Sequence, residues 1–98
     1  MNVVFVGTSD AFGAGGRRQS AIFVDGPGGG LLLDCAPTTA SGLAALGIER
    51  GAIDAIALSH FHADHIAGVP QLLLAAVSED RRRSPLVIAG PPGVEARI

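Results

Sequence analysis

The residues of this chain best suited to chemistry are three histidines and an aspartate that lie close together in sequence. The sequence contains no histidine outside this group, whose members are His60, His62, Asp64 and His65. Imidazole and carboxylate groups are the usual protein ligands of Zn²⁺ and related divalent ions. The group lies between two apolar runs, 53–58 and 66–77. It therefore predicts a metal-binding loop between a strand and a helix.

The spacing of the four residues divides them into two pairs. Residues i and i+2 of an extended backbone point to the same side, so His60 and His62 can bind one ion, each at ~2.0–2.1 Å. If the chain turns after His62, Asp64 and His65 are presented separately and can bind a second ion ~3.5–4 Å from the first, as in two-metal hydrolytic sites. The helical His-Glu-x-x-His pattern of other metal sites is a different geometry.

Two simpler interpretations compete with this metal site. One is a polar surface turn in an ordinary structural α/β module, where the histidines lie together by chance. The other is a structural zinc site, but such sites usually recruit cysteine thiolates, and the only cysteine, Cys35, is distant in sequence. The concentration of every histidine beside an acid favours the metal site over both.

The elements that must position this loop are predicted in the order βββαβαβ. Apolar runs and turn signals indicate strands at 3–6, 20–24, 31–34, 55–59 and 86–89, and helices at 39–46, from the loop to about 77, and beginning near 93. The first strand should be buried, and the apolar stretch 72–77 should be buried on more than one side. Pro70 should lie in the first turn of its helix, where proline is tolerated. The glycine-rich loop 7–16 either lines a substrate cleft or only connects two strands.

Composition limits the classes of protein that this chain can represent. Its hydrophobic fraction of 48% is ample for a core, whereas the net charge of -2 gives no electrostatic case for nucleic acid as a whole-molecule partner. The single cysteine excludes an internal disulfide and is typical of a reducing compartment. Neither a signal peptide nor an apolar run of the ~20 residues that span a bilayer is present. We therefore expect a cytoplasmic protein without a membrane segment.

The histidine loop resembles the signature of the metallo-β-lactamase fold superfamily. That signature is similar to His60-x-His62-x-Asp64-His65 after a strand that ends at Ser59. Three further segments resemble the ribonuclease Z-like branch: the opening strand and glycine-rich loop (3–13), the next strand with its acid (31–35), and the strand-to-helix step after the metal helix (85–93). The resemblance covers nearly the whole chain.

The resemblance implies an α/β fold in which residues 1–98 form the N-terminal half of a single four-layer αββα domain. This half has a strand-rich start followed by βα units. Family members are considerably longer, and their later half supplies a third histidine for the first metal, an aspartate that bridges both metals and a last histidine for the second. No histidine follows His65 here. We therefore expect the site to need a C-terminal half that this chain lacks.

The resemblance also implies roles for individual residues. The metal ligands would be His60, His62, Asp64 and His65, in a site that holds two Zn²⁺ ions in the complete domain, with Mn²⁺ or iron as alternatives. Asp64 would in addition be catalytic, since it could position the attacking water or accept a proton. Asp34 would orient a histidine ligand by accepting its other N–H, although a polar residue that closes a strand is the simpler interpretation. Cys35 is expected to be a small buried filler.

The activity implied for the complete domain is hydrolysis by a metal-activated water. The resemblance indicates a phosphodiester substrate, either RNA or a small cyclic phosphodiester, and a homodimer is among the expected assemblies. Thioester or lactam hydrolysis by the same fold is one alternative. The other is a non-catalytic metal-binding fragment, because the isolated chain lacks half of the site and is expected to be inactive.

Overall fold

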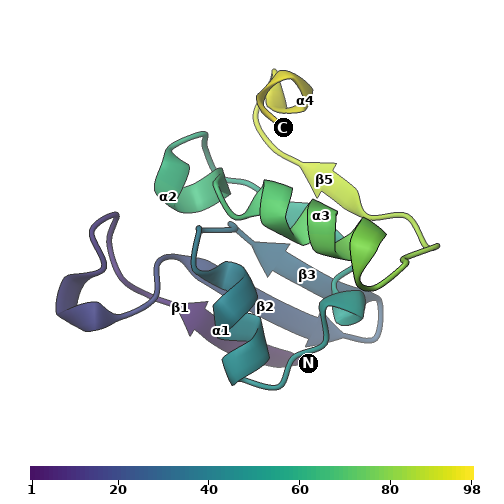
Figure 1. Cartoon of the computed structure of the whole chain (residues 1–98), viewed down its shortest axis with the longest axis horizontal. Coiled ribbons are helices and arrows are strands. Elements are labelled where there is room, and N and C mark those ends of the chain that lie inside the picture. The colour runs from purple at the N-terminus through teal and green to yellow at the C-terminus, as the bar shows by residue number, and fades with distance from the viewer.

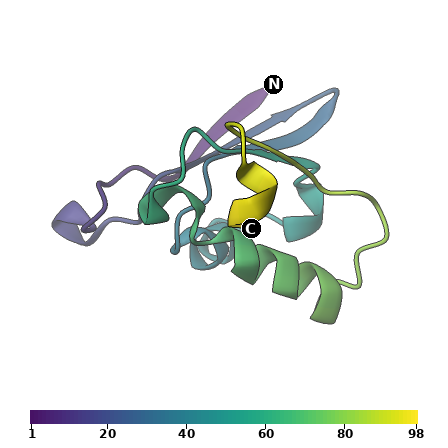
Figure 2. The same ribbon diagram turned by 90° about the horizontal axis from the view of Figure 1, so that it is seen from above.

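The computed structural model describes residues 1–98 as one mixed five-stranded sheet with helices on one face (Figures 1 and 2). The strands are β1 (Asn2–Gly7), β2 (Ala21–Gly26), β3 (Gly29–Leu33), β4 (Ala55–Ala57) and β5 (Val87–Ala89). The α-helices are α1 (Thr39–Ala45), α2 (Ala63–Ile66), α3 (Val69–Ser78) and α4 (Val94–Arg97), and the 3-10 turns are η1 (Ala14–Gly16) and η2 (Arg50–Ala52). The predicted α/β class and order of strands are confirmed.

The strands lie in the sheet in their order along the chain. The pairs β1–β2 and β2–β3 are antiparallel, whereas β3–β4 and β4–β5 are parallel. Parallel neighbours need a crossover connection, and here α1 lies in the first crossover and α3 in the second. Consequently β1, β3, β4 and β5 all end at the same edge of the sheet, which is where the histidine loop leaves it.

The hydrophobic core lies between the sheet and the helices α1 and α3. Leu32 of β3 and Ile56 of β4 are fully buried, as is Leu43 of α1, and Leu72 of α3 joins the same cluster. Cys35 is also fully buried, which agrees with its expected place as a small filler. The adjacent parallel strands β3 and β4 therefore both run through the core and end side by side.

In Figure 2 no helix lies over the opposite face of the sheet, and apolar side chains on that face are exposed. Val3 and Phe5 of β1 are 53% and 61% exposed, and Val87 of β5 is 58% exposed. The prediction that residues 3–6 form a wholly buried strand is therefore wrong. Successive side chains of a strand point to opposite faces, and only Val4 and Val6 point toward the helices and pack with the core.

The helix predicted from the histidine loop to about residue 77 is two helices, α2 and α3. They are separated at Ala67 and Gly68, where the Gly68 N–H donates to the Cys35 carbonyl over 2.9 Å. Pro70 lies in the first turn of α3, as predicted. None of the helices has the length and apolar character needed to cross a membrane.

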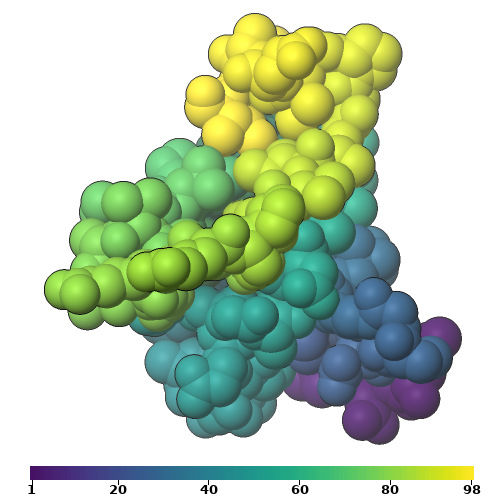
Figure 3. Space-filling view, turned by 90° about the vertical axis from the view of Figure 1, so that its right-hand side faces the viewer, coloured from purple at the N-terminus to yellow at the C-terminus, as the bar shows by residue number.

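The side of α3 that faces away from the sheet is exposed to solvent. Leu72 is buried, but Leu74 and Val77 are 67% and 77% exposed. The expectation that residues 72–77 are buried on more than one side is therefore wrong for this chain, because a single sheet covers only one side of the helix. Figure 3 shows that the C-terminal segment with α4 forms a lobe at one end of the molecule, away from the N-terminal strand.

Candidate metal centre

The predicted site residues lie where the parallel strands β3 and β4 end. Leu33 pairs with Ala57 in the sheet, so the two strands finish side by side. Asp34 follows directly after β3, and its N–H still donates to the Ala57 carbonyl over 2.8 Å. The histidine loop begins after β4. In open α/β sheets, the crevice beyond the carboxyl ends of the strands is the usual place for ligands.

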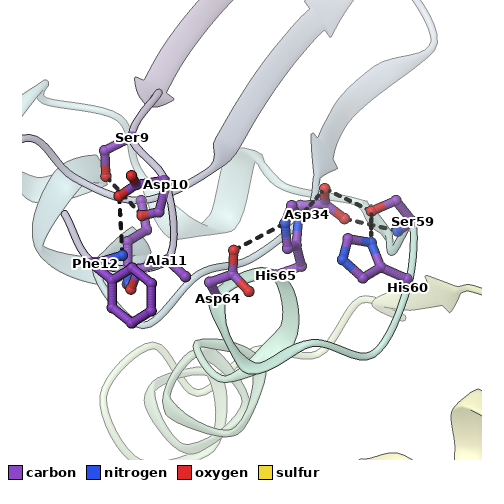
Figure 4. A network of polar contacts seen from close by, with 10 residues as sticks. Ser9, Asp10, Ala11, Phe12, Asp34, Ser59, His60, Asp64 and His65 are labelled. Carbon is purple, nitrogen blue, oxygen red and sulfur yellow. Dashed lines mark hydrogen bonds and ion pairs between the residues drawn. The ribbon is translucent and has the colours of Figure 1, made fainter. Parts of the chain in front are cut away.

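Asp34 is the centre of a polar network that joins these two strand ends (Figure 4). Its carboxylate accepts hydrogen bonds from the Ser59 N–H at 2.8 Å and from the Ser59 hydroxyl at 2.9 Å. Its Oδ2 also lies 2.8 Å from His65 Nδ1. The backbone of Asp34 has φ 61°, in the left-handed region that Asp tolerates better than most residues. This turn directs the side chain toward the loop after β4.

The same network sets the charge of Asp34. Partial burial disfavours the ionised form, but the hydrogen bonds from Ser59 and from His65 outweigh this effect, and the pKa of Asp34 is held below its ordinary value. Asp34 is therefore a carboxylate at neutral pH. In that form it can only accept hydrogen bonds.

The three histidine rings lie close to one another, and His65 contacts this carboxylate directly. The rings of His60 and His65 have centroids 4.1 Å apart, and those of His60 and His62 are 4.6 Å apart and nearly perpendicular, at 81°. His60 Nδ1 lies 2.8 Å from the Ser59 hydroxyl. His62 immediately precedes α2 in extended backbone and is exposed. The structure thus brings all three histidines together, with His60 at the centre.

Asp64 lies in the first turn of α2 and turns back toward His65. Its Oδ2 is 3.1 Å from His65 Nε2, and the two side chains are 19% and 21% exposed. The chain does turn after His62, as the spacing predicts, and it presents Asp64 and His65 as a pair. Their facing oxygen and nitrogen atoms are both of the kind that binds Zn²⁺.

These residues fit part of a metal site rather than a closed one. No three His, Cys, Asp or Glu side chains surround one point in a way that could hold an ion. A structural zinc site needs four ligands, and a catalytic one three with an open position. The pair formed by Asp64 and His65 supplies two donors. The donor atoms are of the kind that binds Zn²⁺, but fewer than three donor residues surround any single point.

Ser59 is a residue of this network to which sequence reasoning gave no role. The strand predicted at 55–59 ends at Ala57, so Ser59 lies in the loop and its side chain turns to Asp34. The available signal was a hydroxyl residue immediately before the first histidine. Its partner is 25 positions away in sequence, and for this reason the contact could not be seen from the motif.

The glycine-rich loop after β1 leaves from the same edge of the sheet, because β1 and β3 are both antiparallel to β2. Asp10 organises this loop by accepting hydrogen bonds from the N–H groups of Phe12 at 3.1 Å and Ala14 at 3.2 Å. Phe12 is 94% exposed. Figure 4 draws this loop in the same view as the histidine network. A role for the loop in lining a substrate cleft stays a prediction.

Comparison with known proteins identifies one family model and many relatives. The model described as "Anti-Pycsar protein Apyc1" matches residues 1–92. Ribonuclease Z of Halorubrum lacusprofundi is 40% identical over 95 residues, which cover 97% of this chain and 30% of that protein. Ribonuclease Z of Lachnospira eligens is 35% identical over 94 residues, which cover 96% of this chain and 31% of that protein.

Comparison with solved structures agrees with these sequence matches. The short form of human tRNase Z superposes with a TM-score of 0.88 at 32% identity, over 98% of this chain and 37% of the human one. The metallo-β-lactamase fold protein YhfI from Bacillus subtilis superposes with a TM-score of 0.79 at 28% identity, over 96% of this chain and 38% of that one. The chain thus spans about three-tenths of the length of the curated relatives above.

Proposed function

The chain belongs to the family described as anti-Pycsar protein Apyc1, and from its relatives named ribonuclease Z and its similarity to the tRNase Z structure we infer that the complete protein is a metal-dependent hydrolase of phosphodiester bonds. The expected resemblance to the metallo-β-lactamase fold, in its ribonuclease Z-like branch, is confirmed by the relatives and solved structures. The observation that carries the proposal is the gathering of Asp34, His60 and Asp64 around His65 at the edge of the sheet.

The relatives' fold implies a divalent metal, and we propose Zn²⁺, with Mn²⁺ or iron as alternatives. The residues that would hold it are His60, His62, Asp64 and His65. Divalent ions bound there would lower the pKa of a coordinated water to about 7 and polarise the phosphoryl oxygen. The relatives are longer than this chain, and we propose that the remaining ligands of the two-metal site come from the rest of the complete protein.

Within this proposal the side chains of this chain have separate tasks. Asp64, which faces His65, would hold the attacking water in place or accept its proton. Asp34 would keep His65 oriented through the contact at Nδ1, since a histidine that binds metal through one nitrogen usually donates from the other. His60 and His62 would act only as ligands, and therefore as neutral imidazoles.

For the substrate we propose an RNA phosphodiester, and the curated relatives support this because they are named ribonuclease Z. A small cyclic phosphodiester is the alternative within the same chemistry. Some solved neighbours are metallo-β-lactamases, which supports a lactam as a second candidate, but two of them have TM-scores of only 0.55 over 74% and 0.63 over 94% of this chain. The score of 0.88 over 98% for tRNase Z favours the phosphodiester.

The test uses the complete protein rather than residues 1–98 alone. It should hydrolyse bis(p-nitrophenyl) phosphate and a short RNA when Zn²⁺ or Mn²⁺ is added, and a chelator should stop the reaction. A complete protein that cleaves thioesters or lactams and leaves every phosphodiester intact would refute the proposal. A metal-binding protein without any of these activities would instead support the non-catalytic alternative. Homodimerisation and a cytoplasmic location stay predictions.

A further inference from the structure

The Ser59 hydroxyl occupies a position between two groups that both need a hydrogen-bond partner. Its Oγ lies 2.9 Å from Asp34 Oδ2 and 2.8 Å from His60 Nδ1. The backbone N–H of the same residue donates to the other oxygen of Asp34. Ser59 is therefore held by Asp34 at two points, and its hydroxyl is not free to turn away from the histidine without losing one of them.

The protons available on Asp34, Ser59 and His60 determine which of these groups donates each hydrogen bond. Asp34 is a carboxylate and only accepts, so the single Oγ–H proton of Ser59 points to Asp34. Toward His60 the serine oxygen can then only accept. The contact at 2.8 Å is a hydrogen bond only if His60 Nδ1 carries a proton. In neutral His60 the other nitrogen, Nε2, then has a free lone pair.

We propose that Ser59 is a positioning residue that fixes His60 as the Nδ1–H tautomer and leaves Nε2 to bind metal. The proposal rests on the proposed function, since it concerns how one ligand of that metal site is prepared. It assigns one carboxylate to two histidines: Asp34 holds His65 directly and holds His60 through the Ser59 hydroxyl. Partners of this kind usually change metal affinity 10- to 100-fold when they are removed.

The direct test is the tautomer of His60 in the metal-free chain, read by ¹⁵N NMR of the ring nitrogens. We expect a protonated Nδ1 and a bare Nε2 for His60 in the wild-type chain. In Ser59→Ala the ring should change to a mixture of both tautomers. The Nδ1 signal of His65 should not change, because its contact with Asp34 is direct.

Ser59→Thr is the matched control, since it keeps a hydroxyl at the same position. This variant should keep the wild-type tautomer of His60. Calorimetric titration with Zn²⁺ alone should show affinity reduced about 10- to 100-fold in Ser59→Ala and restored in Ser59→Thr. Loss of affinity in both variants would point to a merely structural role and would contradict the proposal.

The His60 tautomer in the wild-type spectrum tests the proposal even if Ser59→Ala does not fold. A His60 ring that carries its proton on Nε2 in the wild-type chain would overturn it. An unchanged tautomer in a folded Ser59→Ala would overturn it as well. Neither result depends on catalysis, so a complete protein that hydrolyses no phosphodiester would refute the proposed function and leave the tautomer result standing.

Discussion

Gly68 lies directly against the carbonyl group of Ala36. A Cβ atom on Gly68 would be 2.1 Å from that oxygen, a distance that no real structure allows. The N–H of Gly68 donates to the Cys35 carbonyl, and the N–H of Cys35 donates in turn to the His65 carbonyl over 2.7 Å. Backbone hydrogen bonds therefore connect the segment after β3 to α2 and to the turn that follows it, and these bonds hold His65 beside Asp34.

We expect Gly68→Ala to destabilise the chain strongly, because the added methyl group must displace backbone rather than a flexible side chain. The loss should exceed about 2 kcal/mol, in the upper part of the range for single substitutions, and denaturant unfolding measures it. Gly51→Ala is the matched control, since nothing lies within 4 Å of a Cβ at Gly51. Equal stability of the two variants would show that the close contact is not required.

Metal binding by the 98-residue chain should be weak, because only part of each ligand shell is present. Isothermal titration calorimetry with Zn²⁺ should detect this binding in the wild-type chain and no binding in the double variant with His60→Ala and His62→Ala. The reason is that the double variant removes two of the three imidazoles. If stoichiometry and affinity were the same in both proteins, the assignment of these two histidines as ligands would fail.

In the complete protein, Asp64→Ala should lower kcat by at least ~10²-fold, the lower end of the effect of a positioned acid–base group. The fold should be little affected, because Asp64 is on the first turn of a short helix and its contact is with His65. Steady-state kinetics on bis(p-nitrophenyl) phosphate and thermal unfolding measure the two effects. Asp25→Ala, an exposed acid in the β2–β3 hairpin, should leave kcat unchanged.

The stability of the chain should decline at alkaline pH because of Cys35. Burial raises the pKa of its thiol from 9.0 to about 11. A pKa that is higher in the folded state gives stability that is fully present below pH 9.0 and is lost as the pH rises through about 11, by roughly 3 kcal/mol in total. Urea unfolding between pH 8 and pH 11 should show this decline in the wild type and a smaller one in Cys35→Ala. A parallel decline in both would assign the effect to other groups.

The open apolar face of the sheet should bind a hydrophobic dye. Phe5 belongs to this face together with its β1 neighbour Val3, and exposed apolar surface of this kind is typical of interaction sites. Phe5→Thr should therefore reduce the fluorescence of bound anilinonaphthalene sulfonate. Phe12→Thr removes an even more exposed ring from an isolated loop position and should reduce it less. A monodisperse wild-type chain that binds no dye would contradict this interpretation.

The sequence predicts those features that depend on neighbouring residues. The histidine loop, the strands and the place of Pro70 are local patterns, and the structure places them as expected. The division between α2 and α3 was missed because it depends on contact between Gly68 and Ala36, which only the folded chain brings together. The contact of Ser59 with Asp34 was missed for the same reason.

Residues 3–6 and 72–77 are less buried than the sequence predicts. Alternating or continuous apolar residues show that a segment can be buried, but they do not show what covers it. Phe5 and Leu74 have apolar side chains and lie on faces without a covering layer. Hydrophobicity along the chain therefore identified the strand and the helix correctly and gave no information on which of their sides remain open.

The contacts that orient His60 and His65 are all made by residues between Asp34 and Gly68. A ribosome releases the chain from its N-terminus at about 5–20 residues per second. Once residue 68 has emerged, every partner in the hydrogen bonds that set these two rings is present, whereas Leu72 of the core and the Ala89 carbonyl that accepts from the Leu58 N–H come later. The part of the site described above therefore gains its own hydrogen-bond partners first, and its packed support only after α3 and β5 have followed.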